Sequence, residues 1–131
     1  MIFVDTSAWF AMTVPSDQDH AAVTHCFSQS AEPLFTTDYV MDETLTLLRA
    51  RGYDQRALAL GAEFFSGSLA ELYYLSETDV QAAWEVFRRY DDKKWSFTDC
   101  ASKVVMEQLQ ITRAISLDHH FHQFGNIYVM P

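Results

Sequence analysis

Four acidic residues from four separate segments are the candidates for chemistry in this chain: Asp5, Glu43, Asp99 and Asp118. Asp5 and Asp118 each directly follow a short apolar run, Ile2–Val4 and Ile115–Leu117, of the kind that forms a buried strand. In an open parallel sheet, ligands bind outside the carboxyl ends of the strands. Carboxylates gathered at such an edge would hold a divalent cation, which can activate water to hydrolyse a phosphodiester bond.

The other two acids fall in expected helices. Asp99 would lie in the first turn of a helix over residues 98–109, where the helix dipole favours an anion. In a helix over residues 39–51, Glu43 falls at the edge of the apolar stripe, whereas Asp42 falls on the solvent side. We therefore expect Glu43 to point inward and Asp42 to point outward.

A cluster of four carboxylates requires compensation of its charge. Two carboxylates about 4 Å apart repel by roughly 4 kcal/mol at an effective dielectric constant near 20. Their pKa values must rise together, or a divalent ion must neutralise them. Because the donors are oxygens, with no Cys or paired His at ligand spacing, the sequence favours Mg²⁺ or Mn²⁺ over zinc.

Each acid also has a purely structural interpretation, which is the better one if the acid is taken alone. These alternatives are a helix cap for Asp5, a capping box with Ser96 for Asp99, a turn with His119 and His120 for Asp118, and an ion pair with Arg51 or Lys103 for Glu43. The convergence of all four acids on one sheet edge favours a common site instead.

Strand-like and helical segments alternate along the chain. The expected strands cover residues 2–4, 72–75, 114–117 and 127–129, and the expected helices cover residues 6–12, 19–30, 39–51, 54–65, 76–90 and 98–109. Thr6 and Ser7 would cap the first of these helices, and Asp38 would cap the third. This order indicates βαβ units in a three-layer α/β fold with a mainly parallel sheet, in one domain over residues 1–131.

The charge of the chain is strongly negative and unevenly distributed. The net charge of the 131 residues is −9, and residues 1–48 contain seven acids with no Lys or Arg. An acidic surface repels nucleic acid unless a cation intervenes, so the excess serves solubility, a metal site or the docking of a basic partner. Two distant cysteines and the lack of a signal peptide or a membrane-length apolar run predict a cytoplasmic protein.

The chain resembles the PIN domain, the metal-dependent nuclease fold of VapC-type toxins in bacterial toxin–antitoxin pairs. Four segments carry the resemblance in this order: Val4–Ala8, Asp42–Leu45, Ser96–Ala101 and Ser116–Phe121. The resemblance implies a five-stranded parallel sheet in an α/β/α fold, with Asp5, Glu43, Asp99 and Asp118 holding Mg²⁺ or Mn²⁺. It also implies that Thr6 and Ser7 support Asp5, that Thr98 places a hydroxyl beside the site, and that Ser96 caps a helix.

The same resemblance implies cleavage of RNA, an antitoxin whose C-terminal tail enters the acidic groove, and a homodimer. One departure concerns the residues after the fourth acid. Some relatives have a further acid there, whereas His119 and His120 follow Asp118 in this chain. The resemblance therefore does not extend to a complete second metal site, and we interpret His119, His120 and His122 as surface or substrate-side residues.

A short basic segment is the candidate contact surface for RNA. It contains Arg88, Arg89, Lys93 and Lys94, interleaved with Tyr90 and Trp95. Phosphate contacts combined with stacking aromatic rings would suit single-stranded RNA. The alternative is a solvated helix end whose charge is cancelled by Asp91 and Asp92.

Three other functions are compatible with these residues. The first is a PIN nuclease of RNA processing that has no antitoxin. The second is a phosphatase with Asp5 as its nucleophile, which would need an Asp-x-Asp pair where this chain has Ser7. The third is a non-catalytic module whose acids bind a basic peptide.

Overall fold

A five-stranded, entirely parallel sheet forms the centre of the molecule. The computed structural model describes residues 1–131, and the strands follow the spatial order β3-β2-β1-β4-β5. Their bounds are β1 (Ile2–Val4), β2 (Leu34–Thr37), β3 (Glu71–Tyr73), β4 (Arg113–Ile115) and β5 (Tyr128–Met130). In the central register Phe3 pairs with Phe35 on one side and with Ala114 on the other. The predicted parallel α/β sheet is confirmed.

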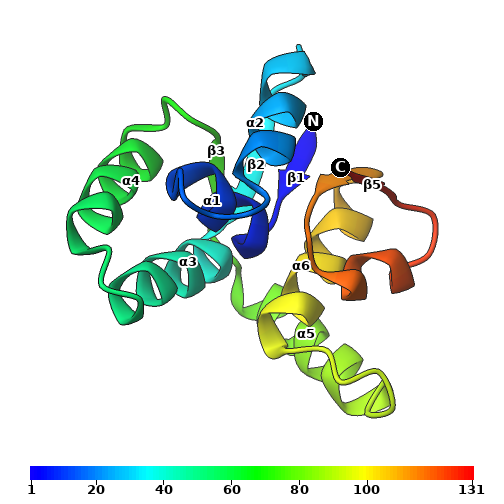
Figure 1. Ribbon diagram of the computed structural model, residues 1–131. Coiled ribbons are helices and arrows are strands. Elements are labelled where there is room, and N and C mark those ends of the chain that lie inside the picture. The colour runs from blue at the N-terminus through cyan, green and yellow to red at the C-terminus, as the bar shows by residue number, and fades with distance from the viewer.

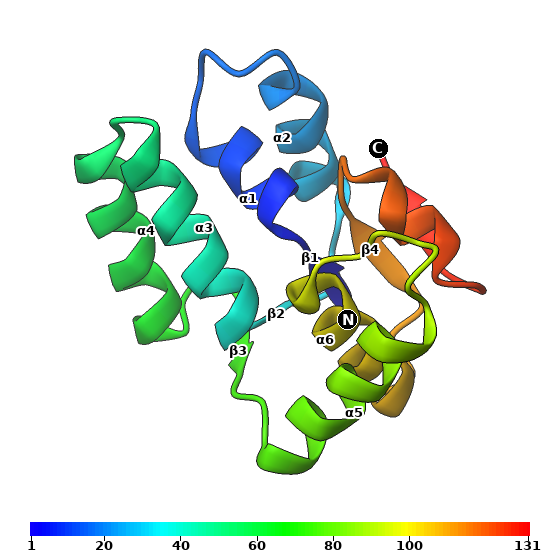
Figure 2. The ribbon, with the colours of Figure 1, turned by 90° about the horizontal axis from the view of Figure 1, so that it is seen from below.

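Helices cover both faces of the sheet. They are α1 (Thr6–Thr13), α2 (His20–Gln29), α3 (Asp38–Ala50), α4 (Asp54–Ser66), α5 (Glu77–Arg89) and α6 (Phe97–Gln108), with a 3₁₀ helix, η1, over His119–Gln123. Helices α1 to α4 lie on one side, and α5 with α6 lies on the other (Figures 1 and 2). Helix α3 also contacts α6, so the two layers meet beyond the end of the sheet. None of the helices combines the length and the apolar character that a membrane span requires.

Strand β2 was not predicted, although it pairs with both β1 and β3. Its sequence has two apolar residues followed by Thr36 and Thr37, which is too short an apolar run to indicate a buried strand. The Thr36 hydroxyl is fully buried, donates to the Val4 carbonyl at 3.0 Å and accepts from Trp9 Nε1 at 3.3 Å. These two hydrogen bonds allow a polar residue to occupy a central strand.

The caps of the helices differ in part from the prediction. Thr37, rather than Asp38, caps α3 by accepting from the Val40 amide at 3.2 Å. Asp38 is already the first residue of the helix, and its Oδ1 accepts from the Leu75 amide at 3.0 Å. Asp38 therefore fixes the connection that follows β3. The predicted N-terminal boundary at this helix was wrong by one residue because a tertiary contact uses the Asp38 side chain.

The core is rich in aromatic side chains. The largest fully buried ones are Trp9, Phe3, Phe35, Phe64 and Phe121. The Trp9 ring meets Phe64 edge-on at 5.1 Å between centroids, and Phe3 lies between Phe35 and Phe121. This packing fixes α1 against α4 and η1 against β1, and both α1 and η1 carry candidate site residues.

Replacing Thr36 by Val should lower the free energy of unfolding by about 1–3 kcal/mol, because Trp9 Nε1 would lose its buried acceptor. Urea denaturation monitored by circular dichroism measures this difference. The exposed Thr46 on α3 provides a matched control, since Thr46→Val makes the same chemical change without a buried partner. Equal stability losses in the two variants would contradict this account of β2.

Candidate active site

The candidate site lies where the strand order reverses direction. The chain builds β2 and β3 on one side of β1 and then returns to place β4 on the other side. Such a switch point leaves a crevice outside the carboxyl ends of the two central strands. Asp5 stands there directly after β1, and its amide donates to the Ile115 carbonyl at 3.1 Å. Asp118 lies three residues beyond β4, because this strand is shorter than the predicted one.

Asp5 is almost fully buried, with 4% of its surface exposed. Its Oδ2 accepts hydrogen bonds from the Ser7 and Ser116 hydroxyls, each at 3.0 Å. Burial raises its pKa from 3.8 to about 6; these hydrogen bonds act against the increase, and repulsion from Asp99 adds to it. Asp5 occupies the N-cap position of α1, but its side chain makes no capping hydrogen bond. The helix-cap interpretation of Asp5 is therefore wrong.

The two serines tie Asp5 to the segment that carries Asp118. Ser7 Oγ accepts from the Leu117 amide at 2.9 Å, and Ser116 Oγ accepts from the Asp118 amide at 3.0 Å. Ser7 thus lies beside Asp5 as the resemblance implied, whereas the Thr6 side chain lies beside Glu43. Ser116 was missed, because a small polar residue in an expected strand gives no signal of a contact made across 111 positions.

Glu43 projects from α3 toward the same edge and is half-buried, whereas Asp42 is exposed. Burial raises the pKa of Glu43, and repulsion from Asp99 and Asp118 adds to the increase, while the nearby Thr6 hydroxyl acts in the opposite direction. The helical-stripe prediction is confirmed for both acids. The alternative ion pairs of Glu43 are not formed, because Lys103 pairs with Glu107 and the Arg51 guanidinium lies over the Phe10 ring.

Asp99 combines a structural contact with a place in the site. Ser96 caps α6, and the two residues form the predicted capping box: the Asp99 amide donates to Ser96 Oγ at 3.0 Å, and the Ser96 amide donates to Asp99 Oδ2 at 3.1 Å. The same Oδ2 lies 2.9 Å from His120 Nδ1. Thr98 is half-buried in the same turn of the helix. The capping interpretation of Asp99 is thus correct without excluding the carboxylate from the cluster.

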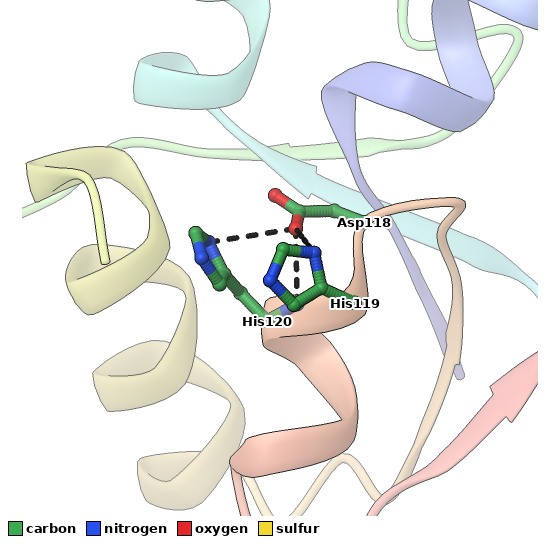
Figure 3. A group of neighbouring side chains, drawn as sticks. All are labelled: Asp118, His119 and His120. Carbon is green, nitrogen blue, oxygen red and sulfur yellow. Dashed lines mark hydrogen bonds and ion pairs between the residues drawn. The ribbon is translucent and has the colours of Figure 1, made fainter. Parts of the chain in front are cut away.

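Asp118 caps the 3₁₀ helix η1, as its turn interpretation predicts. Its Oδ1 accepts from the His120 amide at 2.9 Å and lies 3.4 Å from His120 Nδ1. The His120 ring extends from η1 on the side of Asp118 that faces α6 (Figure 3). The His120 side chain is only 18% exposed, so it is not a surface residue and instead faces the acids. The neighbouring His119 side chain is 80% exposed.

The four acids repel one another without a strong cation among them. Asp99 raises the pKa values of both Asp5 and Glu43, and Asp118 raises that of Glu43. No Lys or Arg forms an ion pair with any of the four, whose only basic neighbours are histidines. The Thr6 hydroxyl is buried beside Glu43 and forms no hydrogen bond of good geometry within the protein. A donor set of carboxylate and hydroxyl oxygens with excess negative charge fits a hard divalent cation.

The structure divides the predicted basic segment into paired and unpaired side chains. Arg88 is paired with Glu85, and Lys93 is paired with Asp92, whereas Arg89 and Lys94 are exposed and form no ion pair.

Trp95 cannot stack on a base, because it is buried and its Nε1 donates to Gln123 Oε1 at 2.8 Å. Tyr90 packs on Trp95 and is half-buried. The exposed aromatic rings on α5, the helix that leads into this segment, are Trp84 and Phe87, stacked at 6.1 Å between centroids. The prediction of aromatic stacking at Trp95 was wrong.

Asp5 should make the stability of the metal-free protein depend on pH. Because folding raises its pKa, its stabilising contribution is complete below its unfolded pKa of 3.8 and is lost as the pH rises through about 6. The free energy of unfolding of Asp5→Asn, relative to the unmodified protein, should therefore increase by about 2 kcal/mol between about pH 4 and about pH 8.

Urea denaturation across this pH range, with chelator present, measures the effect. Asp42→Asn is the control and should not show this increase, because Asp42 is exposed. A constant stability difference between Asp5→Asn and the unmodified protein across the range would contradict the buried environment of Asp5.

Comparisons with known proteins agree with this fold. A family model described as PIN domain matches residues 2–127. The chain is 32% identical over 131 residues to the 23S rRNA-specific endonuclease VapC20 of Mycobacterium tuberculosis, covering 100% of this chain and 99% of that protein. It is also 32% identical over 123 residues to a VapC ribonuclease of Archaeoglobus fulgidus, covering 90% of this chain and 77% of that protein.

Solved structures agree as well. The crystal structure of VapC20, described as a sarcin-ricin loop cleaving toxin, superposes with a TM-score of 0.93 at 30% identity and covers both chains completely. FitAcB from Neisseria gonorrhoeae shares the fold, with a TM-score of 0.70 at 15% identity over 100% of this chain and 97% of that one. Since the family model and the relatives match nearly the whole length, this chain belongs to the PIN domain family.

Proposed function

We propose that this protein is a metal-dependent endoribonuclease that hydrolyses RNA phosphodiester bonds, and that it is the toxin of a type II toxin–antitoxin pair. The observation that carries the proposal is the buried Asp5 carboxylate, which two serine hydroxyls orient and which no Lys or Arg neutralises. Asp99, on α6, lies close enough to raise the pKa of Asp5, and Glu43, on α3 across the sheet, is in turn repelled by Asp99 and Asp118. The relatives described as ribonucleases support the reaction type.

Asp5, Glu43, Asp99 and Asp118 would hold the ion, either Mg²⁺ or Mn²⁺. Bound there, such an ion supplies a water activated for attack and positive charge for the phosphate. The protein contributes orientation: Ser7 and Ser116 fix Asp5, while Ser96 fixes Asp99 at the start of α6. Asp5 must be deprotonated to serve as a ligand, which the ion favours and low pH opposes.

The substrate we propose is structured RNA. VapC20, which matches this chain over its full length, is described as specific for 23S rRNA and as cleaving the sarcin-ricin loop. Ribosomes and purified 23S rRNA are therefore the first substrates to test. Sequencing of RNA 5′ ends after incubation would locate the cleaved bond.

The proposal includes an antitoxin and a homodimer, as the family resemblance implies. The description of VapC20 as a toxin supports the first of these partners. The seven acids of residues 1–48, with no Lys or Arg among them, would attract a basic peptide segment at low ionic strength. Co-purification with the product of a neighbouring gene would identify the antitoxin.

Replacing Asp99 by Asn should reduce RNA cleavage at least about a hundredfold, because the site would lose one carboxylate charge while the side chain can still accept the Ser96 amide. Asp42→Asn, on the outer side of α3, is the matched control and should retain activity. Cleavage rates on 23S rRNA and thermal unfolding curves of both variants make the comparison. Full activity of Asp99→Asn, or undiminished cleavage in excess chelator, would contradict the proposal.

We propose that Arg89 and Lys94 contact RNA phosphates, whereas the paired Arg88 and Lys93 contribute less. The double variant Arg89→Ala/Lys94→Ala should raise KM with little change in kcat, and it should reduce the salt dependence of binding by about one to two phosphate contacts. Nitrocellulose filter binding at several salt concentrations measures this slope.

The control for this double variant removes the same charge just after α3 and on α4, through Arg51→Ala/Arg56→Ala, two exposed residues that also form no ion pair (Figure 1). If both double variants weaken RNA binding equally, only the net charge matters and the contact assignment is wrong.

A further inference from the structure

An imidazole lies inside the acidic cluster, where the resemblance led us to expect only oxygen donors. His120 Nδ1 is 2.9 Å from Asp99 Oδ2 and 3.4 Å from Asp118 Oδ1. It thus approaches two of the four acids, which belong to different elements of the fold. No other histidine of the chain lies within ion-pair distance of Asp99.

The position of this ring is fixed by the fold. The His120 amide donates to Asp118 Oδ1, so the first turn of η1 orients both side chains. The next residue, Phe121, is fully buried, with its ring 6.0 Å from Phe3 and 4.7 Å from Phe124 between centroids. The core therefore holds η1 so that His120 faces the acids and His119 faces solvent.

The spacing of these atoms matches that of neighbouring ligands around one ion. With metal–ligand distances near 2.1 Å and octahedral geometry, adjacent ligand atoms lie about 3 Å apart. The two distances of His120 Nδ1 to carboxylate oxygens bracket this value. Asp118 and His120 also belong, together with the exposed His119, to a group whose ligand atoms all lie within 4.8 Å of one another.

A second observation independently points to a ligand at this site. The Thr6 hydroxyl, in a residue that is only 6% exposed, lies beside Glu43 and lowers its pKa, but it forms no hydrogen bond of good geometry with any group of the protein. Buried hydroxyl groups are normally hydrogen-bonded, and a water molecule of an ion's coordination shell would provide such a partner.

We infer that His120 Nδ1 is a ligand of the ion held by the carboxylates and that it makes the site prefer Mn²⁺ over Mg²⁺. This inference rests on the proposed metal-dependent function. Mg²⁺ is bound almost entirely through oxygen, whereas nitrogen ligands bind Mn²⁺ more readily in the order of divalent metal affinities. His119 is excluded from this role, because its side chain is 80% exposed and its Nδ1 is 3.7 Å from Asp118 Oδ1.

The test compares the affinities of the two ions in matched variants. Isothermal titration of chelator-treated protein with MnCl₂ and with MgCl₂ gives the ratio of the two dissociation constants. His120→Asp makes the ligand set all-oxygen, and His119→Asp adds the same charge one residue away. We expect His120→Asp to reduce the Mn²⁺ preference at least about tenfold. His119→Asp should change that preference by less than about twofold.

Pulsed electron paramagnetic resonance of the Mn²⁺-bound protein tests the ligand directly and needs no variant. Nitrogen modulation typical of a coordinated imidazole should be present in the unmodified protein and in His119→Asp, and it should be absent from His120→Asp. If His120→Asp does not fold, the spectrum of the unmodified protein decides.

The outcomes distinguish a failure of the His120 assignment from a failure of the proposed metal-dependent function. Binding of both ions without coordinated nitrogen, or an unchanged preference in a folded His120→Asp, would overturn the role of His120 and leave the carboxylate site intact. In that case the imidazole only donates a hydrogen bond to Asp99. Failure of the unmodified protein to bind either ion would overturn the metal-dependent function itself.

Discussion

A carboxylate that is almost fully buried needs compensation from its surroundings, and the surroundings of Asp5 provide hydroxyl groups in place of a cation. Those hydroxyls come from α1 and from the segment after β4, which adjoin only because the sheet places β4 beside β1. Asp99 and Glu43 add further negative charge from α6 and α3. Like charges are thus held together at one edge of the sheet. The strand order, the two serines and the contacts between helices all contribute to this arrangement.

The helices of this protein could be predicted from local signals. Apolar stripes and capping residues indicated their positions to within one or two residues, and the stripe on α3 distinguished Glu43 from Asp42. Strand β2 could not be predicted in this way, because the partners of Thr36 are Val4 and Trp9, more than twenty residues away. A residue whose position depends only on tertiary contacts leaves no local pattern in the sequence from which it could be predicted.

In the candidate site, too, some residues could be predicted from local patterns and others could not. The four acids could be proposed from their places after strands and in helices, but Ser116 and His120 could not. Ser116 reaches Asp5 across 111 positions, and His120 reaches Asp99 across 21. A structural and a chemical interpretation of one residue also proved compatible, since Asp99 closes the capping box of α6 with the same oxygen that faces His120. An acid at the start of a helix can therefore cap the helix and take part in a site at the same time.

The hydrogen bond from Trp95 to Gln123 joins two segments with different tasks. Trp95 ends the basic loop that contains Lys94, Gln123 ends η1, and Phe124 packs edge-on against the Trp95 ring. If the loop binds a polyanion as proposed, a displacement of the loop would act through these contacts on the helix that carries His120. Thermodynamic linkage would then make the effect reciprocal. If the polyanion changed the affinity of the site for the ion, the ion would change the affinity for the polyanion by the same factor.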